Sequence, residues 1–452
     1  MKKLMWIWGT VALSIGVALS ASSHEGHDHN TRTWLFVGDA SGNLSIFEDI
    51  YLAPMPRVAT YQLTGLDLGE IAAANGKVFV AINAGLTGPA QGLPAGGFAV
   101  VNVPSLEIED IVILESTLTG RASRPVHIYL DPEARYLWVN NDGPSGDNAV
   151  DSVFRVNVEP TSPEYLTSVE ILIGDGHHKS AFSYPSPEQP NARRLMVTHN
   201  LSDRTISIID NDPNSATFLQ VIKTVGPGNA TLPGTDYVPH GMTYSPISGH
   251  IYTGMTDPVD WAVTIIDTTS PDLSVTGIRA GLEPGQIPAA GGYTHAARGG
   301  SIIYIAGWKA SEDGTTGTGW LSAIDATTNA VVAVIELGNL NASSFIENGQ
   351  KLYLPSSSAS MGNPISNVVA VVDINPASVG YHQVIREITV GEGGTHRKGA
   401  ITADGQRAYI PDTCDTCVTI SVIDTRTDTV VDTPVVEGLI PGEVGTVTIA
   451  LE

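Results

Sequence analysis

Histidine is the residue type whose distribution in this chain could do chemistry. Seven of the twelve histidines lie in short segments that separate or begin apolar runs. Neutral imidazole is the commonest metal ligand in proteins, and three or four of its nitrogens at about 2.0–2.1 Å form a zinc site. The ligand candidates are His127, His177, His178, His199, His240, His295 and His396. They are far apart along the chain, so only the fold could bring them together.

A second candidate metal site is the polar tract at residues 23–30, which contains three histidines and two carboxylates. A short flexible tract of this kind is an accessible, kinetically open site, with His24, His27 and His29 as ligands. The alternative is an incidental polar leader between a signal peptide and the fold. Zinc is the first choice of metal and Cu²⁺ the second. The seven methionines do not cluster and calcium-type carboxylate loops are not evident.

The elements that must position the ring histidines follow from an internal repeat. A short β-branched run that ends in an acidic or amide residue occurs eight times, roughly every fifty positions. The copies are residues 44–48, 99–102, 154–157, 206–210, 263–267, 321–325, 369–373 and 420–424. Strand-like repetition at this period is typical of a β-propeller. We therefore predict an all-β fold, an eight-bladed β-propeller of four-stranded blades.

The two ends of the chain are incomplete in a complementary way. The first strand-like run, at residues 33–37, has no innermost strand before it, and residues 446–451 form an innermost-type strand with no blade of its own. Pairing the two closes the ring and removes an exposed sheet edge. We expect a signal peptide at 1–22, a His-rich flexible tail at 23–32 and a single propeller at 33–452.

The blade pattern sorts the histidines by face. The loop into the innermost strand and the loop between the second and third strands open on one face, where all seven ring candidates fall. His250 and His382 fall in turns of the other face. The tightest candidate cluster joins His127, His177 or His178, His199 and His240, whereas His295 and His396 lie further around the ring. The alternative is that each is a partly buried polar residue bonded to backbone carbonyls.

Composition and the N-terminus limit the environment and the partners. Lys2 and Lys3, a short apolar stretch and several small residues have the layout of a secretory signal peptide, too short to span a membrane. We therefore expect a periplasmic protein without membrane insertion. A net charge of −24 disfavours nucleic acid and anionic membrane surfaces and attracts cations. A closed ring has no structural need for a second chain, so we expect a monomer.

Cys414 and Cys417 are the only cysteines. In an oxidising compartment a close pair in a β-rich chain is most often a local disulfide. The alternative is a redox or metal-binding dithiol, although the βαβ context typical of a redox pair is not found here.

The repeats at residues 321–338 and 420–431 resemble those of bacterial extracytoplasmic propellers with YVTN repeats. These repeats, the His-rich tail and the histidines at the channel mouth make the chain similar to the periplasmic zinc metallochaperones of the AztD type. The resemblance implies a zinc site on the ring, a tail that assists transfer, and a partner that is the periplasmic solute-binding protein of a zinc ABC transporter. It implies no enzymatic activity.

Two other function classes remain open at this point. The first is an enzyme, either a propeller that holds a copper cluster for redox work or one that hydrolyses lactones with a bound cation. The sequence shows no paired acid and base motif and no Gly-x-Ser-x-Gly elbow, which disfavours this class. The second is a protein-interaction scaffold in which the histidines are incidental.

Overall fold

The computed structural model divides the chain into two compact units, Met1–Asn30 and Thr31–Glu452, and every described residue lies in the second. The described residues are 33–39, 42–48, 50–51, 54–63, 67–83, 96–119, 125–141, 151–226, 238–256, 262–279, 292–310, 317–342, 344–356, 367–391, 398–414, 417–436 and 444–451. The predicted signal peptide and tail, residues 1–32, lie outside them.

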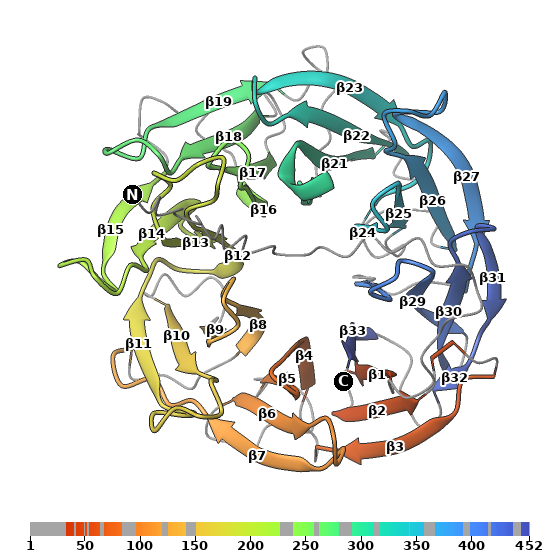
Figure 1. The fold of residues 1–452 in the computed structure, drawn as a ribbon, viewed down its shortest axis with the longest axis horizontal. Coiled ribbons are helices and arrows are strands. Elements are labelled where there is room, and N and C mark those ends of the chain that lie inside the picture. Colours follow the sequence, from red (N-terminus) through yellow and green to blue (C-terminus); the bar gives the residue numbers. More distant parts are fainter. Residues whose placement is uncertain are drawn as a thin grey trace, which may run out of the picture. The chain divides into compact units, whose positions relative to one another are not determined.

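The second unit is an eight-bladed β-propeller, which confirms the predicted fold class. Eight antiparallel sheets surround one axis, each with one strand nearest to it (Figure 1). We number the blades so that blade 1 contains β1 and blades 2 to 8 follow in chain order. The only helical element in the described part of the chain is one 3₁₀ turn, Arg298–Gly300.

The strands have four positions in each blade. The inner strands of blades 1 to 8 are β33 (Val444–Leu451), β4 (Asp67–Ala74), β8 (Pro125–Leu130), β12 (His177–Ser183), β16 (Val238–Ser245), β20 (Thr294–Ala297), β24 (Ile346–Glu347) and β28 (Ala400–Ile401). The second strands are β1 (Thr33–Asp39), β5 (Lys77–Asn83), β9 (Tyr136–Asn141), β13 (Leu195–Asn200), β17 (His250–Thr256), β21 (Ile302–Ala310), β25 (Lys351–Pro355) and β29 (Arg407–Cys414).

The third strands are β2 (Asn43–Glu48), β6 (Gly97–Asn102), β10 (Ser152–Asn157), β14 (Thr205–Asp210), β18 (Ala262–Asp267), β22 (Gly317–Asp325), β26 (Val368–Asp373) and β30 (Cys417–Asp424). The outer strands are β3 (Arg57–Gln62), β7 (Ile108–Ile113), β11 (Ser168–Leu172), β15 (Val221–Val225), β19 (Val275–Arg279), β23 (Ala330–Glu336), β27 (Gln383–Thr389) and β31 (Thr429–Asp432) with β32 (Val435–Val436). Each of the eight repeated runs is the third strand of a blade, as predicted.

The ring is closed by the two ends of the chain. The C-terminal strand β33 pairs antiparallel with β1, from Thr33 opposite Leu451 to Val37 opposite Val447. This confirms the predicted pairing and gives blade 1 its fourth strand. Because β33 supplies the missing inner strand, the edge of β1 is covered by hydrogen bonds.

Apolar third strands hold the blades together. They are buried almost throughout, whereas outer strands alternate between exposed and half-buried residues. Tyrosines of second strands add polar ties: the Tyr252 hydroxyl donates to Asn329 of the next blade at 2.6 Å, and the Tyr353 hydroxyl to Asp428 at 2.6 Å. A buried hydroxyl needs such a partner, so these bonds fix neighbouring blades in register.

Five inner strands contain a β-bulge: β4, β8, β12, β16 and β33. The pairing with the second strand shifts between Leu68 and Ile71 in β4, and β8, β12 and β16 shift at the corresponding place. Each shift leaves two residues out of the ladder. A bulge bends the strand and redirects the extra side chain, so these positions can face the axis of the ring.

Candidate functional site at the hub of the ring

Blades 2 to 8 share one residue position, in or just before the inner strand, which we call the hub position. In blade 2 it is Glu70, immediately before Ile71, which pairs with Val80 of β5 after the bulge. The other blades are aligned through the pairing of their second and third strands. The hub positions of blades 2 to 8 are Glu70, His127, Lys179, Gly241, Tyr293, Ser344 and Lys398.

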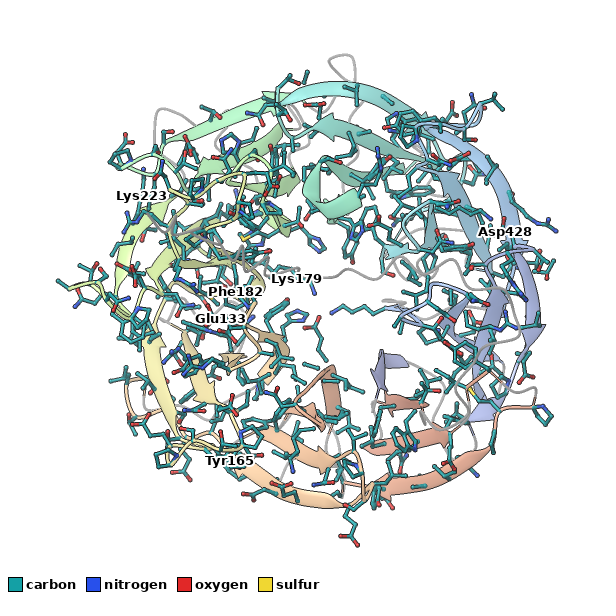
Figure 2. All side chains as sticks on the ribbon, viewed as in Figure 1. Glu133, Tyr165, Lys179, Phe182, Lys223 and Asp428 are labelled. Carbon is teal, nitrogen blue, oxygen red and sulfur yellow. The ribbon has the colours of Figure 1, made fainter. Side chains whose placement is uncertain are left out.

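Three basic side chains from different blades meet the carboxylate of Glu70. Its Oε1 lies 2.9 Å from Nδ1 of His127 and 2.9 Å from Nζ of Lys179, and it also forms an ion pair with Lys398. Its Oε2 accepts a hydrogen bond of 3.3 Å from the backbone N–H of Ile128. Figure 2 shows Lys179 pointing toward the middle of the ring. The four residues, which we call the hub cluster, join blades 2, 3, 4 and 8.

Burial shifts the titration of this cluster. It lowers the pKa of Lys179 and of Lys398 to about 7, although their side chains keep exposed fractions of 15 % and 24 %. The pKa of His127 is well below its usual value because of burial and the nearby charge of Lys179. A neutral His127 with its proton on Nδ1 donates to Glu70 and leaves the lone pair on Nε2.

A second group of histidines lies where blades 4 and 5 meet. His199, in β13, is completely buried, and neither of its ring nitrogens has a hydrogen-bond partner among the described residues. Burial lowers its pKa to about 3; the charges of His240 and Lys179 act in the same direction, and contact with the backbone of His240 opposes them. The ring of His240, in β16, packs edge-on against Tyr293 with the centroids 4.7 Å apart. His199 is therefore a neutral imidazole whose polar atoms are unsatisfied.

The register brings two more predicted ligands to the same junction. His177, in β12, pairs with Asn200, which follows His199 in β13. His178 and His240 both lie one residue before a hub position, within the bulges of neighbouring inner strands. The side chains of His177 and His178 lie outside the described residues, so their part in a site stays a prediction.

The remaining predicted ligands are elsewhere or undescribed. His295 lies in blade 6, with Nε2 2.8 Å from Oε2 of Glu347 and its ring stacked on Phe345. His396 and the tail residues His24, His27 and His29 lie outside the described residues. Within the described part of the chain, no three His, Cys, Asp or Glu residues are arranged to hold a metal ion.

Two histidines lie in or directly after the turns that the sequence assigned to the other face. His250 begins β17, and its Nε2 lies 3.8 Å from a carboxylate oxygen of Asp267. His382 lies in the turn after β26, stacked on Tyr381 with a centroid distance of 3.7 Å. Each of these rings has one buried nitrogen without a hydrogen-bond partner among the described residues, whereas His199 has two.

The two cysteines face each other across a hairpin. Cys414 ends β29, Cys417 begins β30, and the register pairs the two residues directly. Their side chains lie outside the described residues, so the disulfide stays a prediction.

The sequence analysis did not single out Glu70, Lys179 or Lys398. One available signal was spacing: Lys179 follows His177 by two residues, and Lys398 follows His396 by two, each at the start of an inner strand. Glu70 gave no such signal, because a lone carboxylate in a strand reads as a solvent-facing residue.

Comparisons with known proteins show the fold. No protein-family model and no curated protein matches the chain. Among solved structures, dihydro-heme d1 dehydrogenase NirN in complex with DHE matches with 12% identity and a TM-score of 0.55, over 92% of this chain and 74% of that chain. Hydrazine synthase from Kuenenia stuttgartiensis matches with 14% identity and a TM-score of 0.50, over 80% and 96%. Apo AztD from Citrobacter koseri matches with 11% identity and a TM-score of 0.48, over 93% and 98%.

At these identities the similarity establishes a propeller and carries no activity to this chain. In the described part of the chain we find no helix with the length and apolar character that crossing a bilayer requires.

Proposed function

We propose that this protein is a periplasmic zinc-binding metallochaperone that passes zinc to the solute-binding protein of a zinc ABC transporter. The observation that carries the proposal is the junction of blades 4 and 5. There a completely buried, neutral His199 with two unsatisfied ring nitrogens adjoins His240. A metal ion would supply the missing partner, because zinc binds the neutral form of imidazole.

The proposed ring site contains His199 and His240, completed by His177 and His178 from the bulged start of β12. Its position is more favourable for a cation than that of His127. Nδ1 of His127 lies 3.5 Å from the ammonium nitrogen of Lys179, and Lys398 shares the same carboxylate. Two positive charges at that distance oppose a bound Zn²⁺. Glu70 still orients His127 in the way that an outer carboxylate orients a metal-binding histidine.

The tail has the role of a mobile acceptor in this proposal. A buried ring site releases its ion slowly unless a weaker ligand set takes the ion first. The tail would take zinc from the ring and present it to the partner through His24, His27 and His29. A flexible tract can do this because its movement has little conformational cost. Supporting features are the signal-peptide layout and the acidic net charge of −24.

Zinc competition with a chromophoric chelator tests the ring site in the mature protein purified without a His tag. We expect about one tightly bound zinc per chain in the unsubstituted protein. His199→Phe keeps a planar aromatic ring, somewhat larger than imidazole, but removes both nitrogens, and we expect it to weaken zinc binding by roughly a hundredfold or more, as loss of a ligand does. His250→Phe is the matched control, because this histidine lies on the other face, and it should bind zinc normally.

Two outcomes would contradict the proposal. Unchanged zinc affinity in His199→Phe would remove the ring site from this junction, and absence of zinc binding in the unsubstituted protein would favour an interaction scaffold.

Deletion of residues 23–30 separates zinc binding from zinc delivery: the zinc affinity of the ring should stay the same while transfer to the solute-binding protein slows. An unchanged transfer rate would show that the tail has no part in delivery.

A further inference from the structure

We propose that the hub cluster is half of a binding site for a small organic carboxylate, which would lie between Lys179 and Lys398. This site adjoins the zinc junction, since Lys179 follows His178 in β12, but the proposal does not depend on zinc binding. It is suggested by the way in which positive charge is gathered at the centre of a strongly acidic chain. Two lysines and a histidine from three blades meet a single carboxylate, that of Glu70.

The hub cluster holds more hydrogen-bond donors than acceptors. Two ammonium groups carry six N–H bonds, and a carboxylate offers about four lone-pair positions. One oxygen of Glu70 already receives the backbone N–H of Ile128, and the other is shared by three nitrogen atoms. Among the described residues, Lys398 has no partner besides Glu70, and Lys179 contacts only Glu70 and His127. An added acceptor would therefore meet unused donors.

The charge count indicates a ligand with one negative charge. With Glu70 ionised and His127 neutral, and below about pH 7 where both lysines are protonated, two ammonium groups face one carboxylate, which leaves a single positive charge. A largely buried charge without a counter-ion is costly, and a monoanion would restore the balance. A carboxylate has the right charge, and its two oxygens can bridge two donors as those of Glu70 do.

The positions of the lysines leave a side of the hub for the ligand. Lys179 belongs to blade 4 and Lys398 to blade 8, so they extend from opposite sides of the ring, and Glu70 in blade 2 lies between them on one side. The other side, in blades 5 to 7, carries Gly241, Tyr293 and Ser344. The hydroxyl of Ser344 is buried without a hydrogen-bond partner among the described residues. It would donate to a carboxylate held by the neighbouring Lys398.

Acetate is the probe, and the readouts are calorimetric titration and the unfolding midpoint, in the presence of a chelator so that zinc plays no part. We expect saturable binding of acetate that sodium chloride at equal ionic strength does not reproduce. Lys179→Met and Lys398→Met should each weaken acetate binding by roughly tenfold or more, the effect of losing one hydrogen bond to a charged group. Lys223→Met is the matched control, because Lys223 contacts only carbonyl groups near the outer strands.

A variant that should bind acetate more tightly separates the proposal from damage to the fold, because damage would weaken binding. Glu70→Gln removes the internal carboxylate that competes for the two lysines, so it should bind acetate more tightly than the unsubstituted protein. No saturable acetate binding, or an acetate affinity in both lysine variants equal to that of the unsubstituted protein, would overturn the proposal. Binding of inorganic phosphate but not acetate would overturn the assignment to carboxylates.

Discussion

The two sides of the hub differ in chemistry although the backbone places their residues in the same way. Blades 2, 3, 4 and 8 carry the hub cluster, whereas blades 5 to 7 carry Gly241, Tyr293 and Ser344. The repeat fixes the strand and the register, and one residue per blade then decides whether the hub is charged or neutral. A propeller can thus change its chemistry without changing its fold.

The neutral side has a steric cause at blade 5. A Cβ atom on Gly241 would lie 2.2 Å from the carbonyl oxygen of Gly292 and 2.6 Å from the backbone nitrogen of Thr294. A Cβ on Gly254 would meet the same carbonyl at 2.1 Å. The backbones of blades 5 and 6 therefore approach too closely for a side chain at Gly241, although β16 has the same bulge as the inner strands of blades 2 to 4.

The largest expected effect comes from Glu70→Gln on the charged side. The substitution keeps the shape of the side chain but leaves Lys179 and Lys398 without a counter-ion. Removing one member of a buried ion pair costs roughly 3–5 kcal/mol of unfolding free energy. We expect the low end of that range, because both lysines keep some exposure to water. Urea denaturation at neutral pH measures the difference.

Ser344→Ala is the matched change on the neutral side. It removes a buried hydroxyl with no described partner, so we expect a change of less than about 1 kcal/mol. Equal destabilisation by Glu70→Gln and Ser344→Ala would show that the charged side has no special part in stability.

For Gly241→Ala we expect a loss of stability smaller than that of Glu70→Gln. The added methyl group must displace the backbone of Gly292 or Thr294, and overpacking of this kind costs about 1–3 kcal/mol. Thermal unfolding measures the loss. Ala297→Gly, in the adjoining β20, is a comparison variant: it removes a buried methyl group where Gly241→Ala adds one, so any loss of stability comes from a cavity and not from overpacking. If Gly241→Ala were neutral, close backbone contact would not explain the uncharged side.

The fold could be predicted from the sequence because its signal is repeated. Eight β-branched runs ending in an acidic or amide residue fix the third strands, and the mismatched ends fix the closure of β33 on β1. The assignment of His250 and His382 to turns followed from the same alignment. Each of these inferences rests on the period of the chain and not on any one side chain.

The hub cluster could not be predicted in the same way. Glu70 lies in a bulge, and a bulge breaks the alternation of two residues that tells a buried face from an exposed one. Its partners come from blades up to several hundred residues away, as Lys398 does. The sequence interpretation considered the histidines as metal ligands and did not consider the lysines two residues after His177 and His396.

The most selective effect is the pH dependence that the lysines give to stability. The usual pKa of lysine is 10.5, and burial lowers that of Lys398 to about 7 in the folded protein. Between these values the unfolded chain binds more protons than the folded one, so stability should rise as the pH rises. The slope contributed by one lysine is at most about 1.4 kcal/mol per pH unit, and it disappears below pH 7.

Urea denaturation at pH 7, 8 and 9 in the presence of a chelator measures this slope. The window ends at pH 9 because buried tyrosines such as Tyr293, whose pKa is raised by burial, act in the opposite direction at higher pH. Lys398→Met should flatten the slope, because it removes one of the two lysines with a lowered pKa. Ser344→Ala should leave it unchanged. If Lys398→Met has the same pH dependence of unfolding free energy as the unsubstituted protein, the pKa of Lys398 is that of a lysine in water. The charged side of the hub would then not differ from the neutral side in how burial affects titration.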